Sequence, residues 1–277
     1  MTEKTNQIDS EVISLAREVI KDPAEPGEVS PQHIDHTLLK PETTLSQIMH
    51  LCLEAVRYGF KIVSVNPVYV PLCADQLSRS SVKVGSVVGF PFGASTTRIK
   101  VNEAKEAIRQ GAREIDMVIF IGGLKAGQHN VVLDDISKVA DVVHAGDSLL
   151  KVAIETSLLT DDEKIQACKL AKEAGADFVK TSTGFSTGGA VVADVRQMRE
   201  VIGPEMGLKA AGGIRTLAAA EKMITAGANR IGTSAGVKII EEALCRRVKS
   251  AVKTRLDMDM DDQEAQAVIQ RVLEIET

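Results

Sequence analysis

The feature that most constrains the fold is a repeated unit, in which an amphipathic stretch ends at a glycine and a short β-branched run follows. The unit appears as EAVRYGFKIVSV, EAIRQGAREIDMVIF, LAKEAGADFVKTS and MITAGANRIGTS. Its glycines stand where a helix would end in a left-handed residue, at Gly59, Gly111, Gly175 and Gly227. The run behind each glycine is short enough for a buried strand. Repeated helix-then-strand units predict a parallel sheet covered by helices.

Further strand and helix patterns alternate between these units. The additional strands are expected at residues 34–39, 82–90, 149–156 and 206–211. The helical patterns cover Thr96–Gln110, Asn130–Ala145, Asp161–Ala174, Val191–Val201 and Thr216–Ala226. A doubly wound sheet would carry a glycine-rich turn after its first strand, and the chain has none there. Eight strand–helix units between residues 34 and 247 therefore predict an α/β fold, the (β/α)8 TIM barrel.

The segments outside the barrel divide the chain into three parts. Residues 1–33 are expected to form a short N-terminal helical extension, with a helix at Glu11–Lys21 and a linker, DPAEPGEVSP. The barrel domain is assigned to residues 34–250 and a helical tail to residues 251–277. The apolar pattern of the tail is weak, so we expect a terminal helix that frays.

Charge and composition exclude several classes of partner. The net charge of −5 and the pI near 5.7 provide no basic excess for DNA, RNA or anionic lipid. Aromatic residues make up 3% of the chain, too few for a surface that stacks bases. The N-terminal MTEKTNQIDSEV lacks the apolar core of a signal peptide, and no apolar run is long enough for a membrane span. We therefore expect a cytoplasmic protein that binds neither nucleic acid nor membrane.

Ionisable residues at strand ends are the first candidates for chemistry, because a TIM barrel carries its active site there. Asp116 lies in AREIDMVIF, Lys180 ends ADFVKTSTGF, and Lys209 lies in MGLKAAGGIRT. A charge within an apolar strand is costly unless it is paired. Each of these groups is therefore either an outward-facing or salt-bridged structural residue, or one of a set that faces a site. Their matching positions on three strands favour the site.

Two lysines near one another indicate amine catalysis. A free lysine has a pKa of about 10.4 and cannot attack a carbonyl near neutrality. A second cation and a dry pocket both lower that pKa. Lys180 can then be the nucleophile, Lys209 its electrostatic partner and Asp116 a proton carrier, although spacing alone leaves the reverse assignment of the lysines open.

The segments after the last two strands are typical of a phosphate site. KAAGGIRT places Gly212 and Gly213 directly after one strand, and RIGTSAG places Gly232 and Ser234 after the next. Glycines allow the backbone to approach an anion, and the N-terminal N–H groups of the following helices can bind it. Loops after strands seven and eight form the recurring phosphate site of this architecture.

Neither a metal nor another cofactor is indicated. The histidines show no HxH or HxxxH spacing. The four cysteines lie far apart and form no CxxC, so free, buried thiols are expected.

In these residues and the segments around them, the chain resembles the deoxyribose-phosphate aldolases, which are class I, Schiff-base aldolases. The matching strings are IDHTLLKPETT, VNPVYV, VVGFPFGAST, EIDMVIFIG, KVAIETSLLT, DFVKTSTGFSTGGA, KAAGGIRT and RIGTSAG. They extend from about residue 34 to residue 236. The resemblance implies reversible cleavage of 2-deoxy-D-ribose 5-phosphate to D-glyceraldehyde 3-phosphate and acetaldehyde, without a metal or other cofactor.

The resemblance also implies roles for single residues. Lys180 is the Schiff-base lysine, Asp116 the proton-relay aspartate and Lys209 the second lysine. Asp35 in IDHT and Thr183 are expected to bind sugar hydroxyls. The phosphate-binding backbone maps onto Gly184, Gly212, Gly213, Gly232 and Ser234. The partners are thus a small phosphorylated sugar and an aldehyde, and a homodimer is expected because twofold dimers are the commonest oligomers.

The sequence departs from the family pattern at two places. Some members end in a tyrosine that reaches the active site, whereas here the chain ends EIET and its tyrosines are Tyr58 and Tyr69. A water or Asp116 would have to transfer the proton. Many members carry a cysteine where this chain has Ser64, which should leave the aldol step unaffected.

Two other functions remain compatible with the sequence. One is a different phosphosugar barrel enzyme, such as an isomerase or another Schiff-base aldolase. An isomerase would use a carboxylate base without the lysine pair, so Lys180 and Lys209 argue against it. A sugar-phosphate sensor would keep the barrel without turnover, but binding alone does not require a nucleophile.

Overall fold

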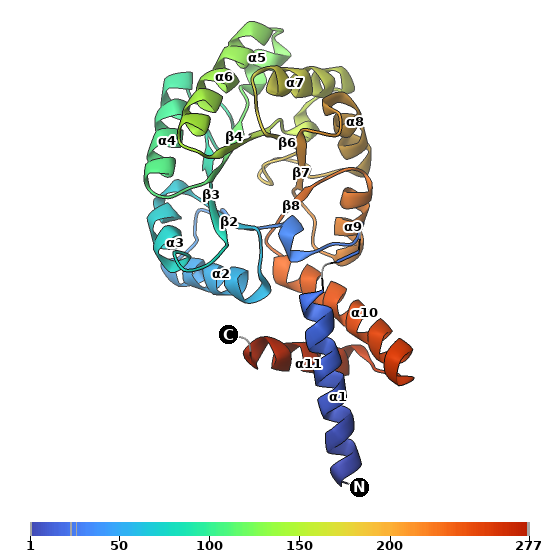
Figure 1. The fold of residues 1–277 in the computed structure, drawn as a ribbon. Coiled ribbons are helices and arrows are strands. Elements are labelled where there is room, and N and C mark those ends of the chain that lie inside the picture. The colour runs from blue at the N-terminus through green and yellow to red at the C-terminus, as the bar shows by residue number, and fades with distance from the viewer. Residues whose placement is uncertain (1, 23, 26, 276–277) are drawn as a thin grey trace.

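A computed structural model describes residues 2–22, 24–25 and 27–275. Its centre is a closed barrel of parallel strands joined in sequence order, β1 to β8, which confirms the predicted TIM barrel (Figure 1). The strands are β1 (Ile34–Leu38), β2 (Ile62–Val65), β3 (Lys83–Val88), β4 (Glu114–Val118), β5 (Leu149–Ala153), β6 (Phe178–Lys180), β7 (Gly207–Ala211) and β8 (Arg230–Thr233).

Helices alternate with the strands and surround the barrel. They are α2 (Leu45–Tyr58), α3 (Val70–Gln76), α4 (Thr97–Arg109), α5 (Ile121–Lys125), α6 (His129–Ala145), α7 (Asp161–Glu173), α8 (Val192–Ile202), α9 (Leu217–Thr225) and α10 (Gly236–Leu256). Three short 3₁₀ turns are η1 (Pro31–His33), η2 (Pro67–Tyr69) and η3 (Thr156–Leu158). The predicted helices after residue 95 match α4 and α6 to α9 to within a residue at each end.

The glycines of the repeated unit behave as the pattern indicates. Gly59, Gly111, Gly175 and Gly227 all have positive φ, from 67° to 115°. A residue with a side chain is strained in this conformation, so glycine ends each helix and turns the chain toward the next strand.

The predicted strand at residues 149–156 is too long. β5 ends at Ala153, and Glu155 adopts the left-handed conformation, with φ 57° and ψ 67°. A left-handed residue cannot continue a strand, because its dihedral angles lie far from the extended region.

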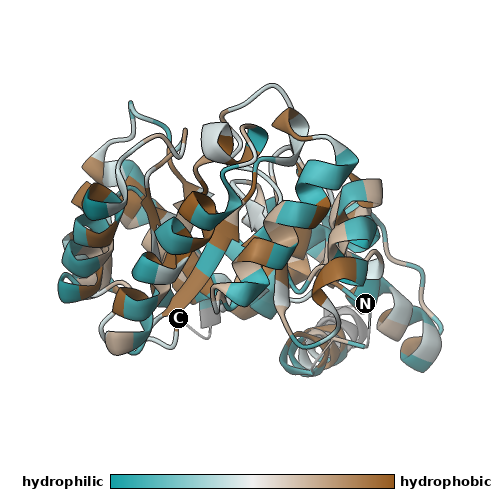
Figure 2. Cartoon of the chain, turned by 90° about the horizontal axis from the view of Figure 1, so that it is seen from above, coloured by the Kyte–Doolittle hydropathy of each residue, from teal (hydrophilic) through white to brown (hydrophobic). Residues whose placement is uncertain are grey.

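The side chains of each strand alternate between two environments. Ile115 and Met117 of β4 are fully buried in the apolar layer between strands and helices. Glu114 and Asp116 of the same strand form ion pairs with residues of other strands inside the barrel. Figure 2 shows the same division on the helices, which are hydrophobic on one side and hydrophilic on the other. The barrel interior is therefore charged, whereas the core lies outside the ring of strands.

The two terminal helices pack together beside α10. Helix α1 (Thr2–Lys21) packs against both α10 and α11 (Asp262–Ile275) (Figure 1). It begins at Thr2, earlier than the expected Glu11–Lys21 helix. The expectation that the terminal helix frays is wrong, because Ala265, Ile269 and Val272 of α11 are fully buried.

In the described part of the chain, no helix combines the length and the apolar character required to span a bilayer.

Candidate active site

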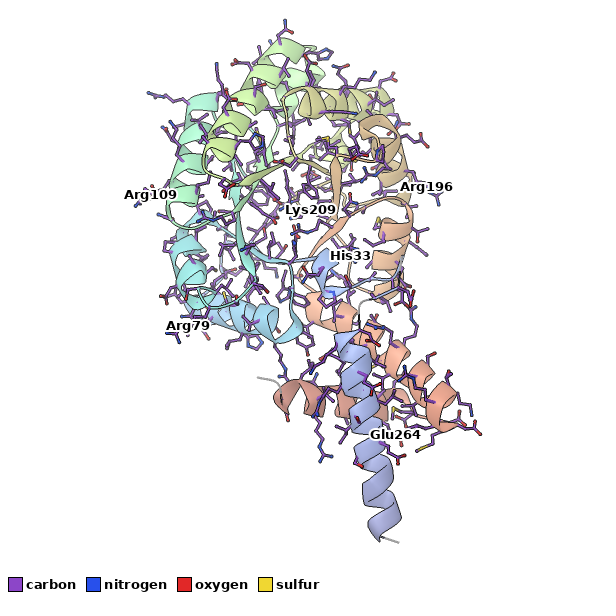
Figure 3. All side chains as sticks on the ribbon, viewed as in Figure 1. His33, Arg79, Arg109, Arg196, Lys209 and Glu264 are labelled. Atoms are coloured by element: carbon purple, nitrogen blue, oxygen red, sulfur yellow. The ribbon has the colours of Figure 1, made fainter. Side chains whose placement is uncertain are left out.

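The register of the strands brings the candidate lysines together. Lys180 at the end of β6 lies directly beside Lys209 of β7, and Asp116 of β4 lies beside Lys151 of β5. Figure 3 shows Lys209 inside the ring of strands, whereas Arg109 and Arg196 extend outward. Because residues at one level of a barrel share a layer, these side chains meet at its centre.

Asp116 stands between the two lysines predicted from the sequence. Its Oδ2 atom accepts hydrogen bonds from Lys180 Nζ at 2.7 Å and from Lys209 Nζ at 2.8 Å. The lysines are 2% and 1% exposed, so the contacts are shielded from water. The structure thus places Asp116, Lys180 and Lys209 in one buried cluster.

Three further charged residues complete this cluster and were not predicted from the sequence. Lys151 contacts Asp116 Oδ1 at 3.3 Å and also pairs with Glu114. Arg230 pairs with Glu114 at 3.2 Å. The signal that singled out Asp116, a charge inside an apolar strand, also marks Glu114, Lys151 and Arg230.

Asp35, the expected hydroxyl-binding residue, belongs to the same cluster of buried charges. It is fully buried on β1, and Lys209 Nζ approaches its Oδ2 atom at 2.6 Å. Arg230 Nε donates to its Oδ1 atom at 2.6 Å. Both carboxylate oxygens therefore contact cations, and Asp35 is not among the residues that line the cavity described below.

The cluster contains one more cation than anion. Its cations are Lys151, Lys180, Lys209 and Arg230, and its carboxylates are Asp35, Glu114 and Asp116. Buried charges are stable only when they are balanced. Loss of one proton from a lysine would leave equal numbers of positive and negative groups.

Lys180 is favoured to lose that proton. Burial disfavours its ammonium form, and although Asp116 opposes the effect, the nearby Lys209 and Lys151 cations add to it. Together they lower the pKa of Lys180 from 10.5 to about 8. Burial also acts to lower the pKa of Lys151, but three carboxylates raise it above its ordinary value.

The carboxylates of Asp116 and Asp35 remain ionised. Burial alone would raise the pKa of Asp116, but Lys151, Lys180 and Lys209 outweigh this effect and hold the pKa well below 3.8. Burial would likewise raise the pKa of Asp35, yet the Lys209, Lys151 and Arg230 cations lower it to about 2.

A cavity of about 250 Å³ opens above Lys180 at the carboxyl ends of the strands. Most of the predicted substrate-binding residues line it. They are Thr183, Gly184, Gly212, Gly213, Gly232 and Ser234. Lys180 also lines the cavity, whereas Lys209 does not. Exposed Lys40 and Arg215 lie at the same cavity and were not singled out from the sequence.

Glycine is required at two of these positions by close contacts. A Cβ atom on Gly212 would lie 2.9 Å from the Cα atom of Gly189, and the φ of Gly212 is +94°. A Cβ atom on Gly232 would lie 2.9 Å from Cε of Lys209. Gly232 therefore leaves room for the side chain of Lys209.

The two tyrosines of the chain, and Ser64 in place of the family's cysteine, do not line the cavity. Tyr58 donates its hydroxyl hydrogen bond to Glu241 and Tyr69 to the carbonyl of Thr43. Ser64 is buried on β2. The chain end EIET extends beyond the described residues, of which Ile275 is the last.

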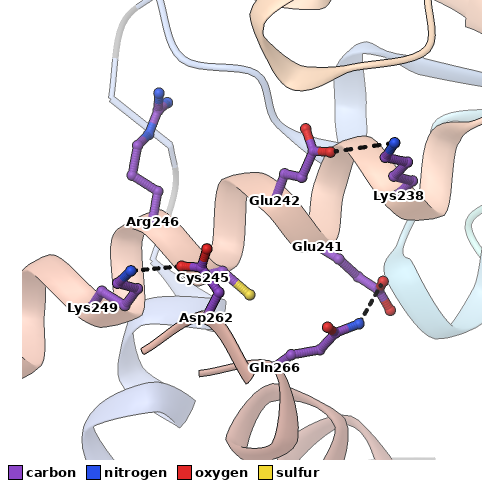
Figure 4. A pocket seen from close by; sticks show the side chains of 8 residues that line it. All are labelled: Lys238, Glu241, Glu242, Cys245, Arg246, Lys249, Asp262 and Gln266. Carbon is purple, nitrogen blue, oxygen red and sulfur yellow. Dashed lines mark hydrogen bonds and ion pairs between the residues drawn. The ribbon is translucent and has the colours of Figure 1, made fainter. Parts of the chain in front are cut away.

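A second pocket lies between α10 and α11, on the appended helices (Figure 4). Its charged side chains pair with one another, as in Lys249 with Asp262 at 2.6 Å and Lys238 with Glu242 at 3.8 Å. Among the residues described, no set of three or more His, Cys, Asp or Glu side chains is arranged to bind a metal.

The chain is similar to known aldolases over most of its length. Residues 29–242 match the model of the DeoC/LacD family aldolases. The deoxyribose-phosphate aldolase of Thermococcus gammatolerans is 59% identical over 214 residues, covering 76% of this chain and 95% of the relative. The deoxyribose-phosphate aldolase of Streptococcus suis is 56% identical over 212 residues, covering 76% of this chain and 96% of the relative.

The fold is also similar to that of a solved relative. The deoxyribose phosphate aldolase of Aeropyrum pernix, described as a tetramer, superposes with a TM-score of 0.74 at 32% identity, covering 82% of this chain and 96% of that one. The sequence and the fold therefore agree on one assignment: the chain belongs to the DeoC/LacD family of aldolases.

Proposed function

We propose that the protein reversibly cleaves 2-deoxy-D-ribose 5-phosphate into D-glyceraldehyde 3-phosphate and acetaldehyde through a Schiff base on Lys180. The observation that carries this proposal is a buried lysine with its pKa lowered to about 8, facing a cavity rimmed by glycine loops. The names of the relatives at 56–59% identity support the substrate.

The reaction follows from the chemistry of an imine. The neutral Nζ atom of Lys180 attacks the aldehyde carbon of the open-chain sugar, and loss of water forms a protonated imine. The imine accepts the electron pair of the C2–C3 bond as the C3 hydroxyl loses its proton, so the bond breaks and glyceraldehyde 3-phosphate leaves. Protonation of the remaining enamine at C2 and hydrolysis release acetaldehyde and regenerate the lysine.

The neighbouring residues have distinct roles in this proposal. Lys209 lowers the pKa of Lys180 without lining the cavity, which favours Lys180 as the nucleophile. Asp116 contacts both lysines and can pass protons between them. Asp35 contacts Lys209 Nζ through its Oδ2 atom and helps to hold that lysine in place.

The glycine loops after β7 and β8 are proposed to bind the phosphate. Ser234 lies just before the N-terminus of α10, and the backbone around Gly213 is open to the cavity. Lys40 and Arg215 add positive charge at the cavity.

Trapping of the intermediate tests the proposal directly. In the wild-type protein incubated with acetaldehyde and borohydride, an ethyl group should replace one hydrogen of the Lys180 amine. The net mass gain is that of C2H4, and peptide mapping locates it. Lys180→Arg should show no adduct and less than about 1% of wild-type turnover, because guanidinium stays protonated and forms no imine. Adduct formation on another lysine, or substantial turnover by a folded Lys180→Arg protein, would disprove the assignment.

We further propose that the protein acts in the cytoplasm as a homodimer. A phosphorylated sugar is charged and is retained inside cells, which favours the cytoplasm. One face of α2 presents an exposed apolar row, formed by Leu45, Met49, Leu53 and Val56. Contiguous apolar rows are typical of contacts between protein copies, and a second copy offers an identical row to cover it.

A further inference from the structure

Glu155, directly after β5, is a buried carboxylate that has no role in the reaction steps proposed above. It is 1% exposed, and its backbone is left-handed. Among the described residues it forms no ion pair, and its Oε1 atom has no hydrogen-bond partner. A buried carboxylate without a cation is costly, and so is a left-handed backbone at a residue other than glycine.

The side-chain hydrogen bonds of Glu155 go to one residue of the cavity. Its Oε2 atom accepts the backbone N–H of Thr183 at 3.1 Å and also accepts the Thr183 hydroxyl. Thr183 lies three residues after Lys180 and lines the cavity. Glu155 therefore fixes both the backbone and the side chain of Thr183.

These contacts determine what the Thr183 hydroxyl can still do. A hydroxyl has one hydrogen to donate and two lone pairs to accept with. The hydrogen goes to Glu155, and one lone pair accepts the N–H of Phe185 at 3.1 Å. One lone pair remains, so toward a ligand Thr183 can only accept.

We propose that Glu155 is a positioning residue for the aldol reaction, which orients Thr183 so that its free lone pair accepts a hydrogen bond from a hydroxyl of the substrate. This inference rests on the proposed function, since it concerns the sugar that Lys180 binds. The site thereby selects a substrate that offers a hydroxyl donor beside the reacting carbons.

A double-mutant cycle tests the coupling between the two residues. Glu155→Gly removes the carboxylate while keeping the left-handed backbone that glycine adopts freely. Thr183→Val removes the hydroxyl at nearly constant shape. Each should lower kcat/KM for deoxyribose 5-phosphate by about three- to tenfold, as expected for the loss of one hydrogen bond between uncharged groups. The kcat/KM of the double variant should be no lower than that of the less active single variant, because both changes remove the same interaction.

Two comparisons separate positioning from a general loss of structure. Glu155→Gln keeps an oxygen that can accept from Thr183, so it should recover most of the activity lost in Glu155→Gly. Asp147→Gly places glycine at another left-handed residue, at the opposite end of β5 with φ 51°, and should leave kcat/KM unchanged. If Glu155→Gly does not fold, Glu155→Asn replaces it, because asparagine tolerates this backbone but is too short to hold Thr183.

Borohydride trapping of acetaldehyde distinguishes this inference from the proposed function. Acetaldehyde has no hydroxyl, so the Lys180 adduct should form at the wild-type rate in the Glu155 and Thr183 variants. The positioning role is overturned if the two losses multiply, if Glu155→Gly retains wild-type kcat/KM, or if adduct formation falls in parallel. Absence of an adduct in the wild type would instead overturn the proposed function.

Discussion

At the scale of single residues, the chemistry depends on which lysine is the excess cation. Lys180 has one carboxylate contact, with Asp116, whereas Lys151 contacts three carboxylates. This unequal pairing explains why the pKa of Lys180 is lowered and that of Lys151 is raised within one cluster. At pH 7, a pKa of about 8 leaves about a tenth of Lys180 as the free amine.

Replacement of Lys209 tests the electrostatic part of this arrangement. In Lys209→Leu, Lys180 loses a neighbouring cation, and Asp116 Oδ2 no longer accepts a hydrogen bond from a second lysine. Both changes favour the ammonium form of Lys180 and raise its pKa. We expect the rise of kcat/KM with pH to move from near pH 8 toward 10. Activity at pH 7 should fall about tenfold each time the pKa of Lys180 rises by one, because the free amine becomes tenfold scarcer.

The measurement is kcat/KM from pH 6 to 10, compared with the wild type. Part of the lost rate should return in alkaline buffer, because the free amine becomes abundant again. A variant that is slow at every pH, with an unmoved profile, would show that Lys209 acts only in proton transfer.

At the scale of elements, the loops between the strands and the following helices position the residues that line the cavity. The loop after β8 places Ser234 at the cavity, just before the start of α10, where the positive end of the helix dipole favours an anion. The same arrangement after β7 brings Gly212 and Gly213 to the cavity.

A charge placed at the start of α10 tests the phosphate site. Ser234→Asp should raise KM for deoxyribose 5-phosphate by about tenfold or more, because the carboxylate repels the phosphate. The fold should be unharmed, since a negative charge near a helix N-terminus is favourable. Unphosphorylated 2-deoxyribose provides the comparison and should be affected by less than about twofold. Equal losses on both sugars, or none in Ser234→Asp, would contradict a phosphate site at this loop.

The exposed apolar row on α2 is the proposed contact surface between two copies of the chain. Leu53 is 65% exposed, and Leu53→Glu would place a charge in the middle of the proposed interface between two copies. The variant should sediment as a monomer while the wild type sediments as a dimer, because a buried unpaired charge is costly. Val131→Glu, at an exposed valine of α6, should leave the assembly unchanged. A monomeric wild type would refute the dimer.

At the scale of the whole molecule, the barrel carries an addition at both ends of the chain. The family match covers residues 29–242, whereas α1 and α11 lie outside it and pack together on the end of α10. Val12, Leu15 and Val19 of α1 are buried in the same continuous core as the barrel helices. The two additions therefore form one extra layer and not two separate tails.

A core substitution in α1 tests whether this layer contributes to folding. Leu15→Ala should lower the free energy of unfolding by about 2–5 kcal/mol, the usual loss for a buried leucine, while kcat/KM stays unchanged. Urea unfolding measures the change, and Val131→Ala at an exposed site serves as the comparison. If Leu15→Ala leaves the unfolding midpoint unmoved, α1 does not unfold together with the barrel.

Much of this architecture was predictable because it is encoded locally. The glycines after each helix, the apolar runs and the charges inside strands are all visible in the sequence, and they led to Asp116, Lys180 and Lys209. Glu114, Lys151 and Arg230 carry the same local signal, but only the closed barrel identifies them as members of the cluster. The ion pair between Asp35 and Lys209 and the hydrogen bond from Thr183 to Glu155 join distant segments, so local patterns could not predict them.

The sequence by itself determined the order of strands and helices, the barrel and the types of residue available for chemistry, because periodicity and turn glycines act within a few residues. Only the tertiary structure decided how the charges are shared. Whether a buried lysine keeps its proton depends on how many carboxylates the closed barrel brings within contact distance, and it brings one to Lys180 and three to Lys151.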